Sequence, residues 1–167
     1  VLLVGSWHAP TLEAVEEIIR MGGLCTETKF RLMGSQCGYF EEQVSRGRVL
    51  PDKVGVLGIV SDEQKHRILA AADIALNPML SGSGTNLKMF EYMAAGIPVI
   101  TSAFWTRGID QKDLFVVAEP GLDMAEAING FEPEKAGEIV LEARRYVRET
   151  FDWSPIARKF LARLEQM

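Results

Sequence analysis

A glycine- and serine-rich turn stands directly before a lysine and a glutamate in the middle of the chain. Gly82 and Gly84 permit a positive φ and the close approach of a ligand, and the first amides of the following helix have no partner inside it. Such amides attract anions, and Lys88 adds a positive charge one turn later. The spacing predicts a phosphate site. The structural alternative is a flexible strand-to-helix turn in which Lys88 makes a weak surface pair with Glu91 or Tyr92.

This turn differs from two common phosphate-binding motifs. A Walker A sequence needs glycine directly before its lysine, but Leu87 precedes Lys88. The dinucleotide fingerprint G-x-G-x-x-G begins at Gly82 and Gly84, yet it meets Leu87 at its third glycine and follows the fourth predicted strand instead of the first. The sequence therefore excludes an ATPase P-loop and disfavours a dehydrogenase.

Glu91 is the candidate for a second contact with the same ligand. Lys88 and Glu91 are three residues apart in the helix predicted over residues 86–95, so they share one of its faces. A carboxylate one turn beyond a phosphate site suits the paired hydroxyls of a ribose, as acidic residues do in other nucleotide folds. The sequence thus predicts that Glu91 binds ribose.

Short apolar runs alternate with amphipathic segments along the chain, which is typical of a parallel sheet covered by helices on both faces. The predicted fold class is α/β, a doubly wound, mainly parallel, Rossmann-like sheet. Strands are predicted over residues 1–5, 29–34, 54–58, 73–77, 97–101 and 114–118. Helices are predicted from about Thr11 to residue 21, over 36–47, from a Ser61–Gln64 capping box to about residue 72, over 86–95, and in three later segments, the last starting at Ser154-Pro155.

The two loops that could form a site come together if the strands take the common order 3-2-1-4-5-6. The switch point then lies between the first and fourth strands, and ligands bind at the carboxyl ends of these strands. The loops there cover residues 5–10 and 78–85, and both point to one crevice. Lys88 is the only lysine or arginine in either loop or in the helix start that follows.

Composition narrows the classes of partner. With 167 residues, 47% of them hydrophobic, the chain is expected to form one domain. Its net charge is −5 and it has no basic stretch interleaved with aromatic residues, so nucleic-acid binding is not expected. Two cysteines and two histidines give neither a disulfide framework nor zinc spacing, so no metal or cofactor is expected. No apolar run approaches the ~20 residues of a membrane span, so a soluble protein is expected. The lack of a disulfide framework fits a reducing, cytoplasmic compartment. The start at Val1, inside a strand, indicates a fragment.

Residues 81–102, SGSGTNLKMFEYMAAGIPVITS, resemble the carboxyl-terminal half of GT-B glycosyltransferases, especially the retaining family 4, or group 1. The likeness continues more weakly in VGSWHAPTLEAVE and VLGIVSDEQKHRILAAADIALNP. In that family this half holds the nucleotide sugar, an amino-terminal domain holds most of the acceptor, and reaction occurs between them. The resemblance implies that residues 1–167 are a single donor-binding domain of a longer enzyme, with 152–167 a helix that can pack toward the absent domain.

The resemblance also implies roles for individual residues. Glu91 is the second acid of the family's E-x7-E motif and binds ribose, the backbone of residues 82–86 meets the diphosphate or sugar, and residues 58–61 border the nucleobase. The predicted donor-binding residues are Gly5, Ser6, Gly58, Ser61, Gly82, Ser83, Gly84, Thr85, Asn86, Lys88 and Glu91, with His8 and Arg107 as further candidates. Catalytic groups are expected in the absent domain. The implied partners are a nucleoside-diphosphate sugar, that domain, and an acceptor saccharide or lipid, the last placing the full protein at the periphery of the inner membrane.

Two positions depart from the family pattern. Ser83 stands where many members carry the first glutamate of the motif, and the usual arginine and lysine are absent from residues 5–10. Lys88 is therefore predicted to compensate by neutralising the diphosphate as it leaves. Two other functions stay open, a non-catalytic nucleotide-sugar binding module and a nucleotide-sugar epimerase of the same fold. His8 could instead be satisfied locally, and Arg107 could be a solvated turn residue.

Overall fold

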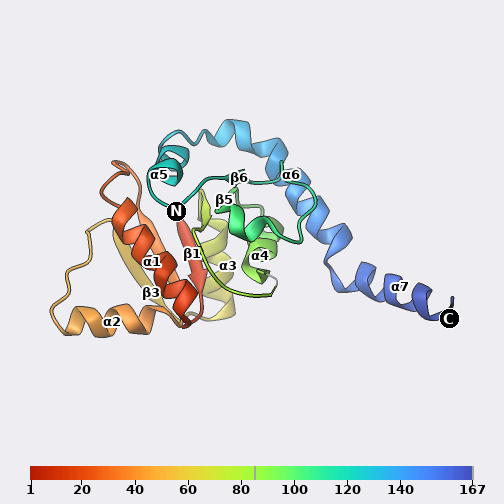
Figure 1. Cartoon of the computed structure of the whole chain (residues 1–167), viewed down its shortest axis with the longest axis horizontal. Helices are drawn as coiled ribbons and strands as arrows, with labels where there is room; N and C mark the ends of the chain where they lie inside the picture. The colour runs from red at the N-terminus through yellow and green to blue at the C-terminus, as the bar shows by residue number, and fades with distance from the viewer. Residues whose placement is uncertain (85, 167) are drawn as a thin grey trace.

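Six parallel strands form one sheet in the order β3-β2-β1-β4-β5-β6 in the computed structural model, which describes residues 1–84 and 86–166 (Figure 1). The strands are β1 (Leu2–Gly5), β2 (Phe30–Gly34), β3 (Val54–Gly58), β4 (Ala75–Asn77), β5 (Val99–Thr101) and β6 (Val116–Val117). The helices are α1 (Ala9–Met21), α2 (Cys37–Ser45), α3 (Asp62–Ala70), α4 (Leu87–Ala95), α5 (Leu122–Asn129), α6 (Pro133–Thr150) and α7 (Trp153–Leu164), and a 3-10 turn, η1, covers Ala103–Thr106. The predicted fold class and strand order are confirmed.

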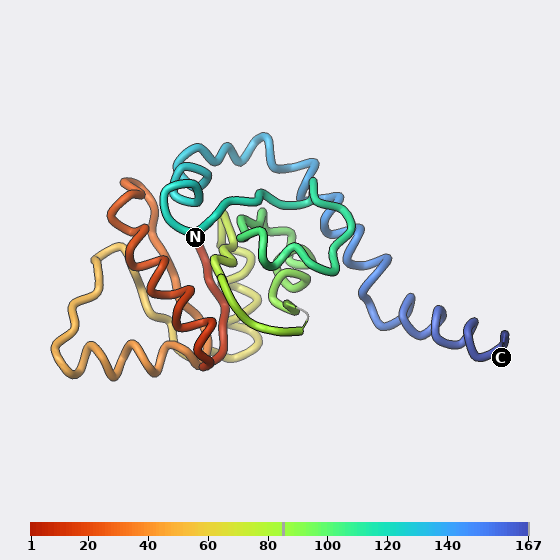
Figure 2. Tube along the Cα trace, viewed as in Figure 1, coloured from red at the N-terminus to blue at the C-terminus, as the bar shows by residue number. Residues whose placement is uncertain are grey.

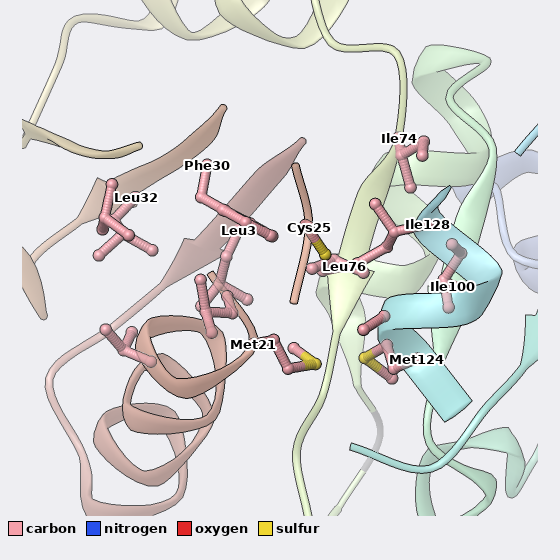
Figure 3. Close-up of a cluster of buried hydrophobic side chains, with 14 of the residues drawn as sticks. Leu3, Met21, Cys25, Phe30, Leu32, Ile74, Leu76, Ile100, Met124 and Ile128 are labelled. Carbon is pink, nitrogen blue, oxygen red and sulfur yellow. The ribbon is translucent and has the colours of Figure 1, made fainter. Parts of the chain in front are cut away.

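Helices cover both faces of the sheet, and neighbouring residues of β1 show why the strand is apolar throughout. Leu3 packs into a cluster with side chains of α1, α2 and α5, among them Met21 and Ile128 (Figure 3). Leu2 points the other way, into a cluster with α3, α4 and α6 that includes Tyr92. Because successive side chains of a strand alternate, a central strand buried on both faces needs a continuous apolar run.

Several element boundaries differ from the sequence prediction, and β4, β6 and α2 are shorter than expected. The helix α1 begins at Ala9, before Thr11, because His8 caps it. The prediction that Ser154 caps the last helix is wrong, since Asp152 is the N-cap and Pro155 falls in the first turn, where its missing N–H is tolerated. The strand β5 starts late because Ile97 donates its N–H to the carbonyl of Tyr92, closing α4.

The carboxyl-terminal helix stands apart from the sheet. In Figure 2, α7 extends away from the body beyond the end of α6. Several of its large apolar side chains are exposed, namely Trp153, Ile156, Phe160, Leu161 and Leu164. Within residues 1–84 and 86–166, none of the helices combines the length and apolarity that a bilayer span requires.

Candidate functional site

The loops after β1 and β4 meet the start of α4 and the turn η1 around one cavity. This cavity has a volume of about 420 Å³. Its lining residues are His8, Pro10, Met79, Gly82, Ser83, Asn86, Leu87, Lys88 and Trp105. The structure therefore brings together five of the predicted site residues at the carboxyl ends of β1 and β4, as the strand order predicts. The predicted Thr85 lies outside the described residues.

Lys88 is the charged centre of the cavity. Its Nζ lies 3.2 Å from Sδ of Met79, a weak acceptor, and no described carboxylate forms an ion pair with it. Burial lowers the pKa of Lys88 to about 8, because removing the ammonium from water disfavours its charged form. An anion bound here would favour the charged form and supply the carboxylate-like partner that Lys88 lacks within the described residues.

Trp105 forms a wall of the cavity that the sequence did not predict. Its side chain is only 6% exposed and packs under the glycine turn. A Cβ built on Gly82 would lie 2.6 Å from Cζ2 of Trp105, and Gly82 has φ +127°. Glycine is therefore required at position 82 both for its backbone conformation and for the close indole. The sequence signal for Trp105 was an aromatic side chain in the segment that leaves β5 at the same edge of the sheet.

Two buried donors accompany Lys88 at the cavity. Nε1 of Trp105 and Nδ2 of Asn86 have no hydrogen-bond partner among the described residues. The lining contains no aspartate or glutamate. A ligand rich in acceptor oxygens therefore suits this cavity better than one rich in donors.

Glu91 faces a different hollow from Lys88. It forms an ion pair with Lys65 of α3, and the two side chains are 34% and 32% exposed. Together with Leu87 and Phe90 it lines a groove that continues to α6 and α7, and Leu87 borders both hollows. A ligand that reaches Lys88 and Glu91 together must therefore pass over Leu87. The alternative in which Glu91 pairs with Lys88 is wrong, because Lys65 takes that place.

The predicted nucleobase border lies after β3, away from the cavity lining. Gly58 ends the strand with φ +72°. The capping box is confirmed, since Oγ of Ser61 accepts from the amide of Gln64 at 3.3 Å and Oε1 of Gln64 accepts from the amide of Ser61 at 3.0 Å. The hydroxyl of Ser61 is thus already used to start α3. Between them, Ile59 is 81% exposed and offers an apolar surface.

The loop after β1 supplies one lining residue and one structural glycine. His8 caps α1, and its Nδ1 accepts a hydrogen bond from the amide of Thr11 at 3.3 Å. In the neutral ring this bond leaves the proton on Nε2. Gly5 is packed so tightly that a Cβ there would lie 2.5 Å from Cγ2 of Thr11. Ser6 is exposed and does not line the cavity.

Arg107 contacts aromatic rings and does not line the cavity. Its guanidinium lies 4.0 Å from the ring centroid of Phe104 and 5.6 Å from that of Trp105. It is absent from the cavity lining. Elsewhere in the described ranges, no three metal-binding side chains of the His, Cys, Asp or Glu type gather at one place.

Solved structures with the same fold include nucleotide complexes. Anabaena HepE in complex with UDP has a TM-score of 0.77 at 19% identity, over 99% of this chain and 49% of that chain. Anabaena HepE in complex with UDP-glucose gives 0.75 at 19%, over 99% and 49%. Sucrose-phosphate synthase from Thermosynechococcus elongatus gives 0.76 at 19%, over 99% and 45%. These likenesses show the Rossmann-like fold of GT-B glycosyltransferases, and this chain spans about half the length of HepE.

Sequence comparison gives the family itself. No curated protein matches the chain. The family described as glycosyl transferases group 1 matches residues 1–131, well over half of the chain. The chain therefore belongs to the group 1 glycosyl transferases.

Proposed function

We propose that this chain is the donor-binding half of a glycosyltransferase that moves a sugar from a nucleoside diphosphate to an acceptor hydroxyl, with retention. The observation that carries the proposal is Lys88, a half-buried ammonium without a carboxylate partner in the described chain, in a cavity at the start of α4. The likeness of residues 81–102 to the retaining family 4 supports the proposed retention. The chain spans about half of HepE, which supports assigning the activity to a longer protein.

The donor is proposed to lie along the carboxyl edge of the sheet. The diphosphate binds at the start of α4 and contacts Lys88, and the sugar occupies the cavity beside Ser83 and His8. The ribose passes over Leu87 to Glu91. The nucleobase then reaches the turn after β3, where exposed Ile59 provides an apolar contact.

Lys88 is proposed to act as the leaving group departs. For retention, the acceptor oxygen bonds to the anomeric carbon on the face that the diphosphate leaves. The bond from that carbon to the diphosphate oxygen breaks, and the acceptor's proton passes to the departing diphosphate. The electron pair stays on the diphosphate, whose negative charge grows. Lys88 and the amides of α4 can stabilise that charge by several kcal/mol where water is excluded, without a metal ion.

We further propose an amino-terminal domain and an acceptor as partners of this chain. The exposed apolar side chains of α7 would pack toward an amino-terminal domain that holds an acceptor saccharide or lipid. A lipid acceptor would bring the full protein, otherwise cytoplasmic, to the inner membrane. A second candidate, a binding module without catalysis, is favoured by one observation, since Ser83 and its neighbours in the lining include no carboxylate to contact the sugar.

A panel of nucleotides tests the proposal. Thermal unfolding of the 167-residue chain would be followed with UDP, GDP, ADP and the three parent nucleosides. One diphosphate should stabilise the chain, by about 2.7 kcal/mol at 100 times its Kd, and more than its nucleoside does. No stabilisation by any diphosphate would contradict the proposal. The chain alone should transfer no sugar, and assaying the longer protein for donor hydrolysis or transfer separates an enzyme from a binding module.

A further inference from the structure

One ion pair joins the two helices that border the proposed nucleoside site. Lys65 of α3 contacts Oε1 of Glu91 in α4. Five of the other six ion pairs in the described chain connect residues three or four positions apart. The pair between Lys65 and Glu91 bridges 26 positions, 91 − 65 = 26. It therefore depends on how α3 and α4 are placed relative to each other.

Both helices are seated firmly enough to fix this contact. The capping box between Ser61 and Gln64 sets the start of α3, and the amide of Lys65 donates to the carbonyl of Ser61 at 2.8 Å. One turn on, Leu69 is buried in the same cluster as Met93 of α4. The backbones under Lys65 and Glu91 thus have defined positions, and only the two side chains need ordering.

We propose that Lys65 is a positioning residue that aims the carboxylate of Glu91 at the ribose of the bound nucleotide. Lys65 occupies Oε1, which leaves Oε2 to accept from the ribose hydroxyls. No other hydrogen bond within the described residues restrains the Glu91 side chain. Without Lys65, binding would have to order a carboxylate that is about one-third exposed. This inference rests on the proposed ribose contact of Glu91.

A purely structural role predicts something different. An ion pair as exposed as this one contributes little to folding. If the ion pair were only a solvent-exposed surface contact, removing Lys65 would change neither the stability of the chain nor its affinity for the ligand. A positioning role predicts a loss of affinity that depends on the ribose hydroxyls, which a surface pair cannot produce.

The test compares UDP with 2′,3′-dideoxy-UDP by calorimetry. Lys65→Met should weaken UDP binding about 3- to 10-fold, the cost of ordering one free side chain, and leave the dideoxy analogue unchanged. Lys65→Arg should keep most of the affinity, because arginine can also hold Oε1. Glu91→Gln should weaken UDP at least about 10-fold, again sparing the analogue. Lys65→Met added to Glu91→Gln should cause no further loss.

Arg67→Met is the matched control. Arg67 lies on the same helix and pairs with Glu63, but that pair faces solvent on its own helix. Its removal should leave both affinities unchanged. Lys65→Gln offers a second variant if Lys65→Met folds poorly.

Each other outcome has a distinct meaning. Unchanged UDP affinity in Lys65→Met, with a loss in Glu91→Gln, would overturn the positioning role and leave the ribose contact standing. Tighter binding in Lys65→Met would show that Lys65 competes with the ribose and would overturn it too. Equal losses for UDP and the analogue would indicate a distorted site and also count against it. An unchanged Glu91→Gln would instead contradict the proposed ribose contact itself.

Discussion

The hydroxyl of Tyr92 in α4 accepts a hydrogen bond from the backbone N–H of Val4 in β1 at 2.7 Å. Tyr92 is fully buried, and burial raises the pKa of its hydroxyl, so the group stays neutral. This bond fixes α4, which carries Lys88, against the strand that leads to His8. The two sides of the cavity are therefore joined beneath the site.

Tyr92→Phe should destabilise the chain. The change leaves the N–H of Val4 without its partner, and it should lower the free energy of unfolding by about 1–3 kcal/mol, measured by urea denaturation. Tyr39→Phe is the control, because it also removes a phenol hydroxyl but keeps the ring that packs between Trp7 and Phe40. Equal stability of the Tyr92 and Tyr39 variants would show that the hydroxyl contributes nothing.

Gly82→Ala should disrupt the turn above the cavity. The new methyl would collide with Trp105, and alanine disfavours the φ of +127°. We expect a loss of about 1–3 kcal/mol of stability together with weaker UDP binding. Gly84→Ala is matched, since Gly84 also has a positive φ, +79°, but among the described residues other than its chain neighbours no atom lies within 4 Å of a new Cβ. Equal losses in the two variants would argue against the contact with Trp105.

Lys88 should make the stability of the ligand-free chain depend on pH. Burial holds its pKa at about 8, below the usual 10.5, so between these values the unfolded chain binds a proton that the folded chain does not. Stability should therefore rise with pH in this window, by at most about 3 kcal/mol from this group. Below pH 8 the buried charge destabilises, so Lys88→Met should be more stable than the wild type at pH 7.

Unfolding at pH 7 and pH 9.5 measures this effect. The wild type should gain stability relative to Lys88→Met as the pH rises. A parallel response of the two proteins would show that Lys88 is solvated, and a less stable Lys88→Met at pH 7 would mean that its ammonium already has a partner.

Repeated patterns in the sequence predicted a parallel sheet, and the common strand order of such sheets then predicted that two loops meet. Apolar runs alternating with amphipathic segments specify parallel strands, and the order 3-2-1-4-5-6 then places Gly82 beside His8. The helix α4 could also be predicted from the sequence, because a glycine, Gly96, ends it with φ +77°. The apolar runs and the glycine that ends α4 are local features, so neighbouring residues alone encode them.

What the sequence missed depends on contacts between distant segments. Trp105 reaches Gly82 from a 3-10 turn, which carries no periodic signal. Three residues along a helix correspond to 300°, so Lys88 and Glu91 differ by about 60° in direction, enough to face separate hollows. The partner of Glu91, Lys65, comes from another helix and could not be found by spacing.

The central claim is that Lys88 binds the diphosphate of the donor, and calorimetric titration of Lys88→Ala with UDP and with uridine tests it most directly. The variant should bind UDP about 10- to 100-fold more weakly, which is about 1.4–2.8 kcal/mol, because it loses a charge that meets phosphate. Its affinity for uridine should stay the same, and its remaining UDP binding should respond less to salt. Unchanged UDP affinity, or equal losses for UDP and uridine, would contradict the claim.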